Sequence, residues 1–188
     1  MHPLILFGLL LALSTQGSFV WAIRRFFVAA GGMQPGMRAI AGAGAICLGV
    51  HLAAIVWRLA DPTPPGPWSG LGLALYGTAL QLFWAAVMAN RERPLTLAFS
   101  EDTPQHLVQW GPYRRIRHPF YSAYLLAWLG GAAVSEQPLL LLTAALMGGL
   151  YVRAARAEEE KFARSPLAPA YAVYRARTGM FLPSVIRA

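Results

Sequence analysis

Five apolar segments dominate this chain and limit it to folds that a lipid bilayer can accommodate. Three of them are Pro3–Ile23, Ile40–Trp57 and Leu71–Ala89, and two shorter ones follow, Tyr121–Ser135 and Leu139–Val152. A spanning helix needs about 20 residues, with a range near 17–25. The sequence therefore predicts an all-α, polytopic membrane protein with about five transmembrane helices. The helices of the last two segments are expected to extend beyond the segment ends given above, or to pack as a hairpin where the bilayer is thinned.

The first segment is expected to remain in the protein as a helix. Val20–Ala22 faintly resembles the cleavage site of a signal peptide. However, the residues before this apolar run include no Lys or Arg, and Arg24 and Arg25 come after it. That order favours a retained helix over a signal peptide.

The composition agrees with a membrane protein, because 56% of the residues are hydrophobic and only 13% are charged, against about 25% charged in soluble domains. The net charge of +8 would suggest nucleic acid as the partner of a soluble protein. Here the charges fall between apolar segments and no basic helix or zinc-finger pattern is present, so membrane lipids with anionic headgroups are expected instead of nucleic acid. The single Cys47 excludes an internal disulfide and offers no metal cluster.

The basic residues are distributed unevenly between the two sides that five spans would create. Fifteen of the 16 Lys and Arg residues fall on one side, and only Arg58 falls on the other. Because positive loops stay in the cytoplasm, the N-terminus is expected outside and the C-terminus inside, in a bacterial-type inner or plasma membrane. One membrane domain, 1–188, is expected, and it divides functionally near Asn90. Before that point ionisable residues are few, and His51 within the second segment is expected to hydrogen-bond to a neighbouring helix.

The segment Trp110–Tyr124 concentrates Tyr, Arg and His residues at the edge of an apolar segment, where such groups tend to mark function. It follows a polar loop, Arg91–Trp110, of a length that is usually functional or disordered. Pro119 disfavours a helical conformation at His118 and can open a new helix itself. His118 would then lie at a helix entrance, where backbone N–H groups attract anions. The neighbouring tyrosines supply aromatic faces that can hold a sulfonium or ammonium ligand.

The segment Arg153–Phe162 supplies acidic residues directly after the fifth apolar segment and is expected to continue it as a helix. Arg153, Arg156 and Glu160 then share one face, and Glu159 lies on the side adjoining Arg156. Two interpretations stay open. The segment is either a solvated helix with pairs such as Arg156–Glu160, or a functional surface opposite the Arg-His-Pro turn, which its position favours.

Together these residues resemble the isoprenylcysteine carboxyl methyltransferase family of membrane enzymes over about Gln105–Pro183. The resemblance rests, in order, on Leu107-Val108, Gly111-Pro112-Tyr113, Arg117-His118-Pro119-Phe120-Tyr121, Glu158-Glu159, Tyr171-x-x-Tyr174 and Leu182-Pro183. The chain departs from the pattern at Gln105 and His106, where eukaryotic members place a single His, and at the Pro-rich Ser165–Pro169. The matching glutamates are therefore either Glu158 with Glu159 or Glu159 with Glu160.

The resemblance implies an S-adenosylmethionine-dependent methyltransferase, with three spans in residues 1–89 and a cofactor-binding, catalytic half with a two-helix hairpin in residues 90–188. It implies a cofactor site formed by Gln105, His106, Leu107, Val108, Tyr113, His118, Pro119, Tyr121, Glu158 and Glu159. It also implies catalytic roles for Glu159 and for Arg153 or Arg156, the arginine lying beside the methyl acceptor. The implied acceptor is lipophilic, either a prenyl-cysteine-type carboxylate, a lipid amine or a small thiol, and no metal is implied. The alternative is a non-catalytic membrane scaffold, or a small-molecule-binding or lipid-binding protein, of the same fold.

Overall fold

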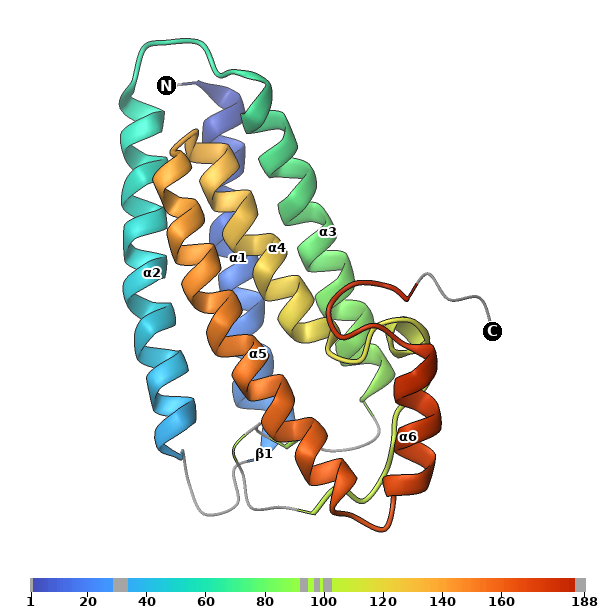
Figure 1. The fold of residues 1–188 in the computed structure, drawn as a ribbon. Coiled ribbons are helices and arrows are strands. Elements are labelled where there is room, and N and C mark those ends of the chain that lie inside the picture. Colours follow the sequence, from blue (N-terminus) through green and yellow to red (C-terminus); the bar gives the residue numbers. More distant parts are fainter. Residues whose placement is uncertain (1, 29–33, 92–94, 97–98, 100–102, 185–188) are drawn as a thin grey trace.

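Five long helices form a bundle in the computed structural model, which describes residues 2–28, 34–91, 95–96, 99 and 103–184 (Figure 1). The helices are α1 (Pro3–Phe26), α2 (Pro35–Ala60), α3 (Pro67–Ala89), α4 (Pro119–Ser135) and α5 (Leu141–Ala163). The shorter α6 (Ala168–Arg177) lies beside one end of the bundle, opposite the N-terminus. Two-residue strands, β1 (Phe27–Val28) and β2 (Leu95–Thr96), pair in parallel, and the short 3₁₀ turns are η1 (Gly111–Arg114) and η2 (Pro138–Leu140). The prediction of an all-α fold is confirmed.

Four of the described helices are long and apolar enough to cross a membrane, namely α1, α2, α3 and the continuous Pro138–Ala163 formed by η2 and α5. The fifth, α4, has 17 residues, at the lower limit for a span. It contacts each of the other four helices, so protein surrounds much of its surface. The last two helices extend beyond the apolar segments Tyr121–Ser135 and Leu139–Val152, because α4 begins at Pro119 and α5 continues to Ala163. The two helices contact each other and form a hairpin.

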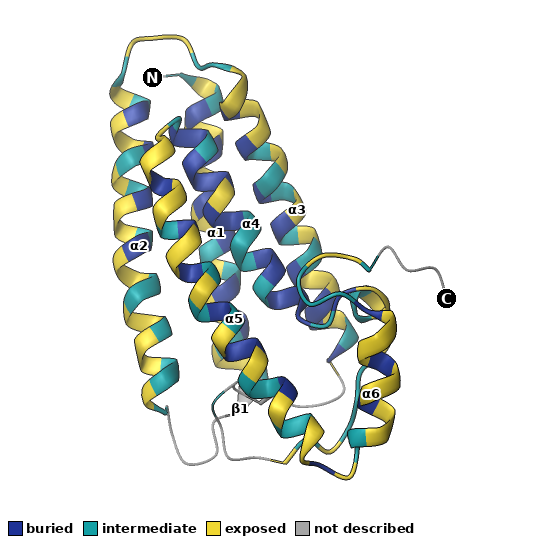
Figure 2. Ribbon diagram, viewed as in Figure 1, coloured by how far each residue is buried: buried dark blue, intermediate teal, exposed yellow. Residues whose placement is uncertain are grey.

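Close backbone packing joins α3 to α4. A Cβ atom on Gly72 of α3 would lie 2.6 Å from the backbone nitrogen of Val134 in α4, so only glycine fits there. Membrane helices associate through small residues of this kind, because lipid tails are as apolar as the helices themselves. Nearer the other end of the bundle, the ring of Phe83 packs against the rings of Phe19 in α1 and Phe120 in α4. The distances between ring centroids are 4.6 Å and 5.4 Å. Exposed residues mark the outer faces of α2 and α5 (Figure 2). Large apolar side chains are among them, including Ile46 and Trp57 of α2 and Leu142 and Leu146 of α5.

A partly buried ion pair lies at the end of the bundle that holds the N-terminus. Arg58 at the end of α2 contacts Glu136 in the α4–α5 turn, with 3.1 Å between Nη2 and Oε2. The other Glu136 oxygen accepts hydrogen bonds from the Gly66 N–H at 2.6 Å and the Ser69 hydroxyl at 2.8 Å. Although burial raises the pKa of Glu136, the bonds from Ser69, Arg58 and Gly66 outweigh it and lower the pKa. Within the bundle, His51 Nε2 lies 2.6 Å from Thr143 Oγ1 of α5, which confirms its expected pairing with a neighbouring helix.

Candidate functional site

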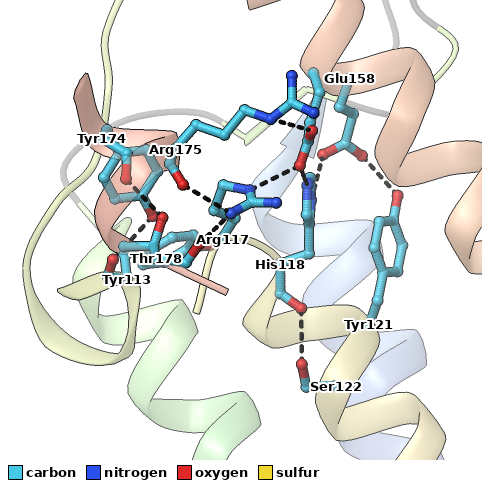
Figure 3. A network of polar contacts seen from close by, with 10 residues as sticks. Tyr113, Arg117, His118, Tyr121, Ser122, Glu158, Tyr174, Arg175 and Thr178 are labelled. Atoms are coloured by element: carbon cyan, nitrogen blue, oxygen red, sulfur yellow. Dashed lines mark hydrogen bonds and ion pairs between the residues drawn. The ribbon is translucent and has the colours of Figure 1, made fainter. Parts of the chain in front are cut away.

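The site begins at the entrance of α4. Pro119 is the first helical residue, and His118 before it has the non-helical angles φ −124° and ψ 65°. This confirms that the proline separates His118 from the helix, as its ring sterics predict. The side chain of His118 points toward α5 (Figure 3).

Two carboxylates of α5 hold the His118 ring (Figure 3). Nδ1 lies 3.3 Å from Glu158 Oε2, and Nε2 lies 3.2 Å from Glu159 Oε1. Glu159 also accepts a 2.8 Å hydrogen bond from Arg117 Nε, and Glu158 accepts a 2.6 Å bond from the Tyr121 hydroxyl. Arg117, His118, Glu158 and Glu159 thus form one group, here called the charge cluster, between the Arg-His-Pro turn and α5. Arg175 of α6 reaches it from outside, with 3.6 Å between its Nε and Glu159 Oε2 (Figure 3).

The charge of His118 is set by this cluster. Burial alone would lower the pKa of His118, because it disfavours the charged ring. The hydrogen bonds and negative charges of Glu158 and Glu159 outweigh that effect and raise the pKa to about 9. At neutral pH the ring is therefore a cation with a carboxylate on each nitrogen.

Tyr113 is held beside this cluster from two directions. Its hydroxyl accepts a 3.0 Å hydrogen bond from Asn90 Nδ2 at the end of α3, and its carbonyl accepts a 2.8 Å bond from the Tyr174 hydroxyl of α6. Burial raises the pKa of Tyr113, and burial likewise raises the pKa of Tyr174 to about 12. Both side chains are neutral hydroxyl groups at physiological pH.

Two cavities meet at the cluster. A cavity of about 510 Å³ with more polar groups in its lining than the other, here called the polar cavity, lies among the loop before η1, α5 and α6. Its lining includes Asn90, residues 103–108, Lys161, Phe162, Tyr171 and Tyr174. An apolar cavity of about 400 Å³ lies among α1, α2, α4 and α5, and its lining includes Gln16, Phe19, Val20, Ile23, Met37, Ile40, Ala41, Gly44, Ala45, Leu48, Pro119, Phe120, Tyr121, Tyr124, Trp128, Met147 and Tyr151. Four residues line both cavities, namely Tyr113, Arg117, His118 and Glu158.

The structure brings most of the residues expected for the cofactor site to these cavities. Gln105, His106, Leu107, Val108, Tyr113, His118 and Glu158 line the polar cavity, and Pro119 and Tyr121 line the apolar one. Glu159 belongs to the charge cluster but lines neither cavity, because its carboxylate is buried against Arg117 and His118. Of the three glutamates in the two possible registers, Glu158 and Glu159 contact His118, whereas Glu160 is exposed and pairs with Arg164.

Arg153 and Arg156 lie elsewhere than the resemblance implies. Both are exposed on the outer face of α5 and line neither cavity. The sequence correctly places them on one face with Glu160, but Ala154, Ala155 and Glu159 form the buried face of this helix. A helix that turns those residues inward must turn Arg153 and Arg156 outward. The geometry does not support the expected position of either arginine beside an acceptor.

Other lining residues were missed from the sequence. Arg117 belongs to the Arg-His-Pro motif, and Tyr171 and Tyr174 belong to the tail motif, but the motifs do not indicate that these side chains line a cavity. Asn90 carried a weak signal, as a polar residue that ends an apolar span. The apolar lining from α1 and α2 carried none, because such residues have the same composition whether they face lipid or a cavity.

The sequence model of a family described as phospholipid methyltransferase matches residues 66–167, which is more than half of the chain. The matched range contains α3, the loop before η1, the Arg-His-Pro turn, the α4–α5 hairpin and both clustered glutamates. Neither a curated protein nor a solved structure matches the chain.

Proposed function

The chain belongs to the phospholipid methyltransferase family, which is related to the isoprenylcysteine carboxyl methyltransferase-like membrane enzymes, and from this we propose that it methylates a lipophilic acceptor with S-adenosylmethionine. One observation carries the proposal. A polar cavity and an apolar cavity share a wall of Tyr113, Arg117, His118 and Glu158. A polar methyl donor and an apolar acceptor can therefore meet there from opposite sides.

The polar cavity has the chemistry that this cofactor requires. Its volume of about 510 Å³ lies within the roughly 300–1,000 Å³ typical of small-molecule sites. Glu158 offers a carboxylate to a sulfonium charge, and Tyr113 and Tyr171 offer aromatic faces, which also attract cations. Lys161 adds a basic group that can meet a carboxylate.

The residues of the shared wall act mainly by positioning. When bound, the cofactor supplies a methyl group on a positively charged sulfur, and the acceptor displaces that sulfur directly. Alignment of donor and acceptor can contribute roughly 7–11 kcal/mol to such a reaction. Glu158 is the group able to remove a proton from the acceptor, because it reaches both cavities and is partly exposed.

The geometry favours an amine or a thiol as the acceptor over a carboxylate. A carboxylate would need a cation in the apolar cavity. Among the described residues, Arg117 is the one arginine lining either cavity. Its Nε donates to Glu159, and its Nη1 donates to the carbonyls of Arg175 and Thr178. His118 is likewise held by two glutamates. Glu158 itself lines the apolar cavity, where its negative charge would repel a carboxylate but could accept a proton from an amine or thiol.

The two cavities also indicate which parts of the chain bind the cofactor and the acceptor. We propose a single membrane domain, 1–188, in which residues 90–188 bind the cofactor and carry the catalytic groups. Residues 1–89 also contribute, because α1 and α2 supply one side of the apolar cavity. We further propose that the N-terminus lies outside the membrane and that α6 and the polar cavity lie in the cytoplasm.

A labelled-methyl assay tests this proposal. Purified protein is incubated with S-adenosylmethionine carrying a labelled methyl group and with a membrane lipid extract, and the labelled product is identified by mass spectrometry. The expected product is an N-methylated or S-methylated lipophilic compound. Glu158→Gln should abolish most of the transfer, while Glu160→Gln, an exposed glutamate of the same helix, should not.

Two results would contradict the proposal at different points. Absence of cofactor binding by calorimetry on folded protein would leave a scaffold or lipid-binding protein as the better description. A base-labile methyl ester as the product would keep the methyltransferase but overturn the amine or thiol assignment.

A further inference from the structure

The segment after α6 returns to the Arg-His-Pro turn and runs alongside it. Residues 178–184, here called the C-terminal strap, form a parallel bridge in which Gly179 pairs with Ile116. The Arg117 N–H donates to the Gly179 carbonyl at 2.8 Å, and the His118 N–H donates to the Met180 carbonyl at 3.1 Å. In return, the Gly179 N–H donates to the Arg115 carbonyl at 3.0 Å. These bonds fix an irregular stretch of backbone that neither η1 nor α4 includes.

Side chains add a second set of contacts between the strap and the site. The Ser122 hydroxyl in the first turn of α4 donates to the Phe181 carbonyl at 2.6 Å. Arg117 Nη1 donates to the Thr178 carbonyl (Figure 3). The Phe181 ring meets the rings of His118 and Tyr121 edge-on, each with 6.2 Å between ring centroids. The strap therefore contacts both basic residues of the charge cluster and also the tyrosine that binds Glu158.

The strap has a fixed shape of its own. A Cβ atom on Gly179 would lie 1.9 Å from the carbonyl oxygen of Leu182, which is a backbone atom three residues ahead. No side chain can move aside to relieve that contact. The turn therefore requires glycine at position 179.

We propose that the C-terminal strap is a positioning element of the site, which holds Arg117, His118 and Tyr121 in register with Glu158 and Glu159 of α5. Its residues line neither cavity, so it acts through the residues that do. The catalytic importance of this element rests on the proposed function, whereas the positioning itself does not. Displacement of catalytic groups by about 1 Å can cost 10²-fold in rate, so loosening the strap should lower turnover.

A matched pair of serine variants in α4 tests the proposal. Ser122→Ala removes the hydroxyl that binds the strap and that also donates to the His118 carbonyl at 3.2 Å, so the second variant must be one that leaves that direct bond in place. Ser135→Ala removes a buried hydroxyl at the other end of the same helix, which donates to the carbonyls of Gly131 and Ala132. Phe181→Leu is the milder second variant, because it keeps an apolar side chain and removes the ring contacts. Full-length proteins in detergent are compared by thermal unfolding, by histidine NMR titration assigned with His118→Gln, and by the kinetics of methyl transfer.

In the wild-type protein and in Ser135→Ala, His118 should titrate near pH 9. In Ser122→Ala and Phe181→Leu it should titrate nearer its ordinary value of 6.5, and kcat should fall by about tenfold to a hundredfold with a smaller change in the KM for the cofactor. Unchanged His118 titration in folded Ser122→Ala and Phe181→Leu proteins would overturn the positioning role, whatever their activity. A wild-type protein without methyl transfer would instead overturn the proposed function and leave the titration result standing.

Discussion

At the level of single residues, contacts decide the charges of the site. His118 is 9% exposed, which by itself would favour a neutral ring. The carboxylates of Glu158 and Glu159 reverse that preference, and Arg117 shares Glu159 with the ring. The two glutamates are neighbours in sequence but differ in surroundings, because Glu158 lines both cavities and Glu159 lines neither. Their roles should therefore separate.

Stability should depend on pH through His118. The pKa of its folded state, about 9, lies above the ordinary value of 6.5, so the folded protein binds the ring proton more tightly than the unfolded chain does. This contribution is fully present below pH 6.5 and is lost as the pH rises through about 9. We expect the difference in melting temperature between wild type and His118→Gln to shrink between pH 7 and pH 10. Thermal unfolding in detergent at several pH values measures it, and a constant difference would contradict this account of the ring.

Glu158→Gln and Glu159→Gln should fail in different ways. Glu159 is 7% exposed and its removal leaves Arg117 and His118 without their shared partner. Breaking such a buried pair costs about 3–5 kcal/mol, so Glu159→Gln should chiefly lower the melting temperature. Glu158 is 29% exposed, so Glu158→Gln should chiefly weaken cofactor binding and methyl transfer. Calorimetry and thermal unfolding on both variants decide the matter, and equal losses of stability would argue against the separation.

At the level of elements, α5 shows what the sequence could and could not predict. Its continuation through the charged segment followed from helical periodicity, and the grouping of Arg153, Arg156 and Glu160 on one face followed from the same period. Periodicity does not say which face turns toward α4. That choice depends on packing, in which Met147, Tyr151 and Ala154 are buried in the bundle. The motif thus identified two glutamates that lie against the Arg-His-Pro turn, whereas both arginines lie on the exposed face of α5.

Arg153→Ala and Arg156→Ala should therefore leave methyl transfer close to the wild-type level. Both side chains are exposed and line neither cavity, and surface substitutions of this kind usually change stability by no more than about 0.5 kcal/mol. Arg117→Ala is the contrasting variant, because Arg117 binds Glu159 and the carbonyls of Arg175 and Thr178. It should lower both stability and turnover. A large loss of turnover in Arg153→Ala or Arg156→Ala, measured with the labelled-methyl assay, would contradict this prediction. It would indicate that the acceptor binds at the outer face of α5.

At the level of the whole molecule, the site lies where the membrane-facing surface gives way to charge. Leu139 in η2 and Leu142 and Leu146 in α5 are exposed, and the exposed Arg153 and Arg156 continue the same helical face. Glu158, which lines both cavities, lies on the next turn of α5 after these arginines. The apolar segments predicted the helices, and the charged segments Trp110–Tyr124 and Arg153–Phe162 predicted which residues gather at this end of the bundle. The sequence could not predict the apolar cavity, which depends on how α1 and α2 pack against α4 and α5.

The proposed orientation of the bundle in the membrane depends on the uneven distribution of basic residues between its two ends. Arg58, the one basic residue assigned to the opposite end, is neutralised by Glu136 and lies 3.9 Å from Asp61. The positive-inside rule counts Lys and Arg residues, so the assignment of fifteen of the 16 to the other side predicts a cytoplasmic C-terminus whether or not Arg58 is paired. A reporter active only in the cytoplasm should work when fused after Ala188, and the same reporter inserted at Thr63 in the α2–α3 connection should not. An inactive but stably inserted fusion at Ala188, with activity at Thr63, would reverse the proposed orientation and place the polar cavity outside.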